Sequence, residues 1–384
     1  MKSITRLSVT AIAALATSAA FAASASAATS AADHVAQRGG YTQQTVFVQT
    51  DNLSGNALVA YTRAANGTLT QAGTYPTGGL GGQLAGSVAD HLASQGSLTY
   101  DPQHGLLYAV NAGSNTVSVF SVSGEHVELR QVVASGGTFP VSIAVHDNVV
   151  YVLNALNGGS IQGYAVVHGD RLAPVPSWNR ALGLDPTATP QFVSTPGQVG
   201  FTSNGTQLVV TTKANGNDID VFNLNWAGAP SAAPVVNSEP GAVPFSFVPD
   251  GVHGLYLVEA GPNALATFTV NPDGTVTQTA ISLTGQSATC WIAADGSWLY
   301  ASNAGSSDLT GFWAGQSGLT DLGNTSTDPG TVDAAVSSDG HYLYAQTGVN
   351  GIVDEFQVGA TGSLTWIGSE TVPGGAGGEG IVAF

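Results

Sequence analysis

Cysteine, basic residues and long apolar runs are all scarce in this sequence, and each scarcity excludes something. A single cysteine, Cys290, cannot form a disulfide within the chain, so burial and strand pairing have to stabilise the fold. Lysine and arginine together number 8 against 25 aspartates and glutamates, and the net charge of −17 disfavours nucleic acid and anionic membranes as partners. No segment approaches the roughly 20 apolar residues that span a bilayer, so we expect no membrane insertion.

The N-terminus has the features of a secretory signal peptide. Lys2 and Arg6 precede a short alanine-rich apolar run, and a triplet of small residues ends at Ala27. We therefore predict a cleaved signal peptide over residues 1–27, a flexible leader over residues 28–42, and a secreted or periplasmic protein. The rest of the chain, from residue 43 to residue 384, is predicted to form one domain.

One sequence pattern recurs along that domain. Each copy has two short apolar strands joined by a turn, a polar residue where the second strand ends, a Gly/Asn turn and a third alternating strand. Six complete copies begin at Ser97, Ser142, Gln198, Ser246, Cys290 and Ala334. Their spacing of roughly 44 to 56 residues fits the four-stranded β-propeller blade better than shorter repeat units.

The seventh copy is divided between the two ends of the sequence. VFVQTDNLSGNALVAYTRAANGTLTQAGTYP, from Val46, supplies three strands, and GIVAF, from Gly380, supplies the missing first strand. Pairing the two segments closes a ring and removes free strand edges. The sequence therefore predicts an all-β, seven-bladed β-propeller closed by its N- and C-terminal strands. Helical periodicity is confined to a short stretch around residues 87–93.

Polar residues at the ends of the second strands form the candidate mouth of the central channel, where propellers bind ligands. In blade order they are Thr50, Asn111, Asn154, Thr212, Glu259, Asn303 and Thr347. The asparagines begin turns in which a side-chain amide can satisfy its own backbone. Asn111, Asn154 and Asn303 are therefore either turn formers or ligand-binding residues.

Glu259 and Lys213 are the candidates for catalysis. Glu259 places a carboxylate at an otherwise apolar strand end, and Lys213 lies one residue past the equivalent position of the preceding blade. At the channel mouth the two could perform acid/base work or bind an anionic or polyol ligand, whereas a peripheral ion pair would contribute little. Loops into the inner strands add Gln198, Gln286 and Asp333, which suit a sugar-like or lactone ligand.

His91 lies beside Asp90 in a long glycine-rich loop and is a further candidate ligand-binding residue at the mouth. The sequence has no zinc-type His/Cys cluster, no phosphate-binding Gly-Lys loop and no G-x-S-x-G nucleophile elbow. Turns such as NGNDID, from Asn215, lack the ligand spacing of an EF-hand, so we expect no bound metal. The scarcity of basic residues disfavours an anionic cofactor such as a quinone, and we expect no cofactor.

The repeats resemble the seven-bladed lactonase family, which includes bacterial 6-phosphogluconolactonase and fungal 3-carboxymuconate cyclase. The resemblance covers nearly the whole chain after the leader and is greatest to secreted paralogues. It rests on SQGSL from Ser94, LLYAVNAGSNTVSVF from Leu106, VVYVLNA from Val149, CWIAADGSWLYASNAGS from Cys290 and PGGAGGEGIVAF from Pro373.

The resemblance also implies a set of catalytic residues, and this sequence departs from most of them. The implied histidine falls on Gly197, the implied arginine falls near Val243 and Pro244, and the aspartate of a DLG-like turn is replaced by Lys213. Glu259 has a family counterpart one residue out of register. Without the histidine and arginine, lactone chemistry loses its natural base and oxyanion binder, and phosphorylated lactones become poor candidates.

Two functions follow from these observations. The first is a lactonase-like hydrolase acting on an unphosphorylated sugar lactone or related cyclic ester, with water activated by Glu259 and the carbonyl polarised by Lys213 or by the ring amides. The second is a non-catalytic secreted propeller that binds a carbohydrate, an envelope component or a protein. Convergence of Glu259 and Lys213 on a water-sized gap would favour catalysis, and a plugged channel would favour binding.

Overall fold

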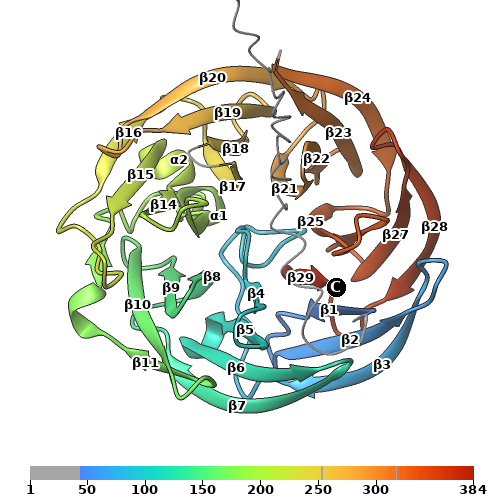
Figure 1. Cartoon of the computed structure of the whole chain (residues 1–384), viewed down its shortest axis with the longest axis horizontal. Coiled ribbons are helices and arrows are strands. Elements are labelled where there is room, and N and C mark those ends of the chain that lie inside the picture. The colour runs from blue at the N-terminus through green and yellow to red at the C-terminus, as the bar shows by residue number, and fades with distance from the viewer. Residues whose placement is uncertain (1–43, 252–253, 317) are drawn as a thin grey trace, which may run out of the picture. The chain divides into compact units, whose positions relative to one another are not determined.

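The computed structural model describes residues 44–251, 254–316 and 318–384. Their strands form seven antiparallel sheets arranged as the blades of a β-propeller around a central channel (Figure 1). The predicted signal peptide and leader, residues 1–27 and 28–42, lie outside the described residues and stay predictions. Within the described ranges, none of the helices has the length and hydropathy required to cross a bilayer.

Six blades are built from strands that are consecutive in the chain, and blade 1 combines β29 with the first three strands; the strands of each blade are given from the channel outward. Blade 1 contains β29 (Ile381–Ala383), β1 (Thr45–Gln49), β2 (Ala57–Arg63) and β3 (Leu69–Pro76). Blade 2 contains β4 (Leu98–Asp101), β5 (Leu106–Asn111), β6 (Thr116–Ser123) and β7 (His126–Ala134). Blade 3 contains β8 (Pro140–His146), β9 (Val149–Asn154), β10 (Ser160–Val167) and β11 (Arg171–Pro174), with β12 (Arg180–Ala181) also pairing with β10.

The remaining four blades each have four strands. Blade 4 contains β13 (Gln198–Phe201), β14 (Gln207–Thr211), β15 (Asp218–Asn223) and β16 (Val235–Ser238), and blade 5 contains β17 (Pro244–Asp250), β18 (Gly254–Glu259), β19 (Ala264–Val270) and β20 (Val276–Leu283). Blade 6 contains β21 (Thr289–Asp295), β22 (Trp298–Asn303), β23 (Asp308–Gly315) and β24 (Gly318–Ser326). Blade 7 contains β25 (Thr331–Val336), β26 (Tyr342–Thr347), β27 (Ile352–Val358) and β28 (Leu364–Thr371).

The ring closes through strands from the two ends of the chain, which confirms the sequence prediction. β29 pairs with β1, so that Phe47 lies opposite Val382. The Arg63 guanidinium adds a hydrogen bond of 3.2 Å to the carbonyl O of Phe384. It also forms a 2.9 Å ion pair with Asp339, so one side chain links the C-terminal end of the closure to blade 7.

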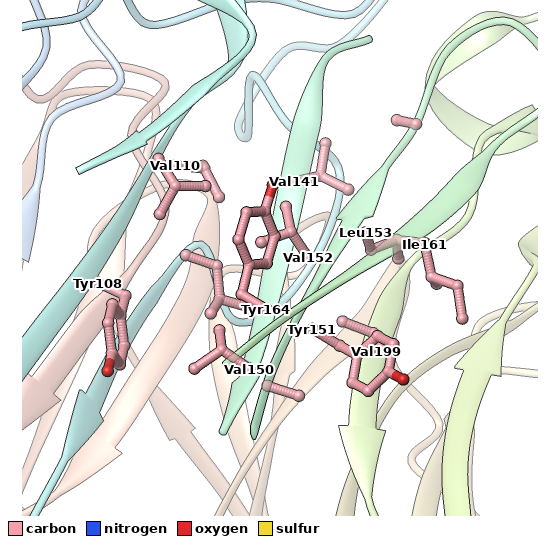
Figure 2. Packing of buried hydrophobic residues seen from close by; sticks show 14 of the residues in the cluster. Tyr108, Val110, Val141, Val150, Tyr151, Val152, Leu153, Ile161, Tyr164 and Val199 are labelled. Carbon is pink, nitrogen blue, oxygen red and sulfur yellow. The ribbon is translucent and has the colours of Figure 1, made fainter. Parts of the chain in front are cut away.

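Strand position in the blade explains the sequence patterns. Second strands such as LLYAVN of β5 are buried along their whole length because both faces of a blade pack against neighbouring blades. Outermost strands such as LTQAGTYP of β3 expose many of their residues. Figure 2 shows Tyr108, Val150 and Val199, which belong to one buried cluster that extends over blades 2, 3 and 4. Each fully buried large apolar side chain contributes about 1.5–3 kcal/mol, so interblade packing stabilises a fold without disulfides.

In the described ranges, helical structure is confined to single turns. These are the short helices α1 (Gln191–Ser194) and α2 (Lys213–Gly216) and the 3-10 turns over Ala112–Ser114 and Pro176–Trp178. The stretch 87–93, where periodicity allowed a helix, consists of bends and irregular backbone. Its Asp90 carboxylate accepts hydrogen bonds from the backbone N–H groups of Leu92 and Ser94, and such local side-chain bonding competes with helix formation.

Candidate functional site

The channel end at which the second strands finish is covered by a glycine-rich segment. This cover segment, residues 78–96, joins β3 to β4 and lies over the centre of the ring (Figure 1). The backbone N–H of His91 donates to the carbonyl O of Gly377, just before β29, at 2.8 Å. The backbone N–H of Gln95 donates to Gly197, just before β13, at 3.2 Å. The cover segment therefore connects blade 1 to blade 4 across the axis.

Side chains fasten the end of the cover segment to blade 6. Gln95 donates from Nε2 to the carbonyl O of Ile292 and accepts the Ile292 N–H at Oε1, both at 2.9 Å. The indole N–H of Trp291 donates to the carbonyl O of Ser94. An apolar cluster from blades 5, 6 and 7 fills the space around them: Phe245, Trp291 and Val332. Packed side chains thus close this end of the channel.

Lys213, at the start of α2, is enclosed by this closure and has no exposed surface. Its ammonium donates to the carbonyl oxygens of Ala93 and Phe192 and, at 3.2 Å, to the Thr195 hydroxyl. Nζ also lies 5.2 Å from the centroid of the Phe245 ring. Burial lowers the pKa of Lys213 to about 7. The side chain therefore holds the cover segment against α1 instead of facing solvent.

Four buried carboxyl groups gather at the same end of the channel: Asp51, Asp90, Asp333 and Glu379. Asp51 accepts the backbone N–H of Glu379 at 2.9 Å, and Glu379 accepts the Ser94 hydroxyl at 2.8 Å. Burial raises the pKa of Asp51 to about 8 and that of Asp90 to about 6. Burial, together with the neighbouring carboxylates, raises the pKa of Glu379 well above its ordinary range.

Perturbed pKa values of this kind occur both at functional sites and in structural networks of charged groups. Whether a ligand can reach the carboxyl group distinguishes the two cases. Within the described ranges, no three His, Cys, Asp or Glu side chains are arranged to hold a metal ion.

Beyond the closure the channel widens into a cavity of about 390 Å³. Its walls come from the inner strands of six blades, namely β4, β8, β13, β17, β25 and β29. Gln95 and Asp333 line its closed end, and His146 and Ser203 line it where β8 and β13 finish, at the opposite face. Apolar residues make up much of the wall: Leu98, Ile143, Val145, Phe201, Phe247, Pro249 and Ile381.

Asp333 lines the cavity from an irregular part of β25. The pairing of β25 with β26 shifts between Thr331 and Ala334, and such an irregularity re-aims the side chains beside it. The Asp333 carboxylate accepts the backbone N–H of Ala334 at 3.0 Å. Burial raises the pKa of Asp333 to about 7. A carboxyl group with that pKa can accept a proton from water near neutral pH.

Lys213 and Glu259, the predicted catalytic pair, are not brought together. The Lys213 ammonium is surrounded by the acceptors described above, and its backbone has a left-handed φ of 53°. Glu259 accepts a hydrogen bond of 3.0 Å from Gln278 on the outermost strand of its own blade. Burial, with the nearby charge of Glu239, raises the pKa of Glu259 to about 7. The expected convergence fails because each side chain points to a different part of the fold.

The three predicted asparagines are fully buried inside their blades. Asn111 accepts a hydrogen bond from the Thr77 hydroxyl, and Asn303 accepts one from the Thr289 hydroxyl. Asn154 donates to a backbone carbonyl at 3.1 Å, and its Oδ1 has no partner among the described residues. In this geometry the three amides support turns and blade packing.

The remaining predicted ligand residues are divided among three places. Gln198 lines the cavity together with Asp333, and both ends of its amide bond the backbone of Phe247. Gln286 is partly exposed in the loop before β21 and does not line the cavity. His91 lies in the cover segment, where burial lowers its pKa, and its Nδ1 has no partner in the described part of the chain.

The family histidine has no room at Gly197, because a Cβ there would collide with the carbonyl O of Phe245. Two residues of the closure, Asp51 and Trp291, escaped the sequence reasoning. Asp51 directly follows Thr50 of the predicted polar ring, and this adjacency is the one signal that could have found it. The contact of Trp291 with the cover segment spans 197 residues and leaves no local signal.

Comparison with solved structures finds the same fold in several bacterial proteins. A protein from Lactobacillus plantarum is 18% identical, with a TM-score of 0.70, covering 88% of this chain and 99% of its own. A putative 6-phosphogluconolactonase from Bacteroides fragilis is 18% identical, with a TM-score of 0.69, covering 90% of this chain and 99% of its own. The periplasmic gluconolactonase of Pseudomonas aeruginosa is 18% identical, with a TM-score of 0.69, covering 88% and 98%.

No curated protein matches the chain. The family described as "Lactonase, 7-bladed beta-propeller" matches residues 83–378, which is most of the sequence. The family description agrees with the seven blades of the structure. The chain belongs to the seven-bladed β-propeller lactonase family.

Proposed function

We propose that this protein hydrolyses an unphosphorylated sugar lactone or a related cyclic ester inside the channel cavity. The observation that carries the proposal is the placement of Asp333, a buried carboxyl group at the closed end of a 390 Å³ cavity. That volume lies within the usual range of small-molecule sites. Family membership supports lactone chemistry in general.

In the proposed reaction Asp333 acts as the general base. The carboxylate takes a proton from a water molecule, the hydroxide attacks the lactone carbonyl, and the ring C–O bond breaks. The leaving alkoxide then takes the proton back from Asp333, which restores the carboxylate and leaves the hydroxy acid. One positioned base accelerates such a step by about 10²–10⁴-fold, so we expect a modest enzyme.

The composition of the cavity supports an unphosphorylated substrate. Neither lysine nor arginine lines it, whereas binding a phosphate normally requires such a cation. Thr99, Gln198 and Ser203 provide polar atoms along the wall for sugar hydroxyls. A phosphate group would instead approach the carboxyl groups around Asp333.

We further propose that the protein acts outside the cytoplasm. The predicted signal peptide over residues 1–27 supports export, and one structural neighbour is named a periplasmic gluconolactonase. An unphosphorylated lactone is the more suitable substrate there, because the protein would be separated from cytoplasmic sugar phosphates.

A second candidate function is ligand binding without catalysis. The closed channel end favours it, because Lys213 is sealed away and does not meet Glu259. A propeller of this kind would bind a carbohydrate, an envelope component or a protein through its cavity or rim.

Hydrolysis of a lactone panel, followed by pH-stat and corrected for spontaneous opening, tests both candidates. The parent chain should open one or more aldonolactones, and Asp333→Asn should lose about 99% of the rate or more, since a general base contributes about 10²-fold at the low end. Glu259→Gln, assayed beside it, tests the position that the sequence suggested. Loss of activity in Glu259→Gln but not in Asp333→Asn would show that the general base is Glu259 of blade 5. If the parent chain hydrolyses none of the lactones, the proposed hydrolase is refuted and ligand binding without catalysis becomes the favoured function.

A further inference from the structure

We propose that the channel cavity selects ligands in which a positive charge adjoins an apolar body, such as a quaternary ammonium or a protonated amine. The inference concerns the same cavity as the proposed function and goes beyond it, because a sugar lactone carries neither a positive charge nor an apolar body. It stands on three features of the cavity: the charge at its closed end, the apolar side chains in its wall, and the absence of lysine and arginine from its lining.

The charge at the closed end is negative whenever the carboxyl groups ionise. Asp333 lines the cavity directly. Asp90 and Glu379 lie close enough behind Asp333 for their charges to affect one another. The ammonium of Lys213 belongs to the same group but is enclosed by Ala93 and α1. A ligand cation in the cavity would therefore reach Asp333 without meeting the ammonium.

The wall of the cavity suits the rest of such a ligand. Phe201 contributes the edge of one aromatic side chain, and Ile143 and Val145 contribute aliphatic surface. Aromatic faces attract ammonium groups, and this attraction grows when water is excluded. One carboxyl group at the end of an aromatic and aliphatic cavity is the chemistry that recognises an amine with an apolar body. An anion of the same shape would be repelled.

The titratable groups that face the site determine its pH dependence. His146 lines the far end on β8, Asp90 and Glu379 lie behind the closed end, and Asp333 lies between them. Burial raises the pKa of Asp333 to about 7, so at pH 5 the group is protonated and attracts a cation weakly. Between pH 6 and pH 8 it ionises, and affinity for a cation should rise over this interval.

Equilibrium dialysis with three probes tests the inference. Benzyltrimethylammonium carries the charge, neopentylbenzene is its uncharged carbon isostere, and phenylacetate is an anionic relative. At pH 8 we expect the ammonium to bind about tenfold more tightly than the isostere and phenylacetate not to bind. Asp333→Asn should abolish this preference. Asp321→Asn, which removes an exposed carboxylate on β24, should keep it.

A second variant guards against a folding defect in Asp333→Asn. Phe201→Leu keeps an apolar wall but removes one ring, and it should reduce the preference for the ammonium without removing binding of the isostere. Equal affinity for the ammonium and its isostere in the parent chain overturns the inference, as does absence of all binding. Lactone hydrolysis by the same samples is scored separately. Ammonium preference without hydrolysis refutes the proposed reaction alone, and hydrolysis without preference refutes this inference alone.

Discussion

Replacing Asp333 with asparagine should stabilise the protein at alkaline pH and have little effect in acid. The ordinary pKa of an aspartate is 3.8, and burial raises that of Asp333 to about 7 in the folded chain. Between these values the folded chain holds a proton that the unfolded chain has lost. The parent protein is therefore stabilised by this group below pH 4 and loses that contribution as the pH rises through 7. Asparagine has the same shape and never ionises, so the variant avoids this loss.

The size of the effect follows from the difference between the two pKa values. A separation of about three pH units corresponds to about 4 kcal/mol of unfolding free energy, taken as an upper limit because water in the cavity can solvate the carboxylate. Urea unfolding followed by tryptophan fluorescence at pH 4 and pH 8 measures this quantity. We expect the stability of Asp333→Asn relative to the parent to rise by about 2–4 kcal/mol between the two pH values. A difference that stays constant with pH, as expected for the exposed control Asp321→Asn, would refute the reasoning.

Two further predictions concern the closure of the channel. Gln95→Leu should destabilise the chain by about 2–4 kcal/mol, because the backbone N–H and carbonyl O of Ile292 both lose their hydrogen-bond partner. Gln71→Leu, on the exposed strand β3, is the matched control. Equal destabilisation by the two substitutions would contradict the proposed role of Gln95. Lys213→Met should cost about 1–3 kcal/mol at pH 7 by leaving carbonyl oxygens without a donor. Because burial lowers the pKa of Lys213 to about 7, the parent gains stability from pH 7 to pH 10, and the deficit of the variant should widen over that range in urea unfolding. A deficit that shrinks as pH rises would show that the lysine is not buried.

The fold could be predicted because its information is repeated and local. Each blade carries its own strand and turn signals, so six copies align with one another, and the two chain ends supply the seventh. The pairing of β29 with β1 followed from the absence of a first strand at the N-terminus and of later strands at the C-terminus. Burial of both faces of the second strands follows from the packing of blade against blade.

The site could be predicted only in part, because its key contacts are long-range. Gln198 and Asp333 were expected in loops entering the inner strands, and both line the cavity. Lys213 was expected at an open mouth, but its ammonium bonds a carbonyl 120 residues away in the cover segment. The glycine-rich sequence of that segment indicates a loop and contains no signal for where the loop lies. The closure, and the side of the channel that stays open, therefore depend on tertiary packing.

The pH dependence of lactone hydrolysis tests the central claim, that Asp333 is the base inside the channel. We predict that kcat/KM of the purified chain rises with pH through an apparent pKa near 7 and then levels off, and that Asp333→Asn is nearly inactive at every pH. A parent profile that follows only the spontaneous, hydroxide-dependent opening of the lactone would contradict the account. Full activity in Asp333→Asn would contradict it as well.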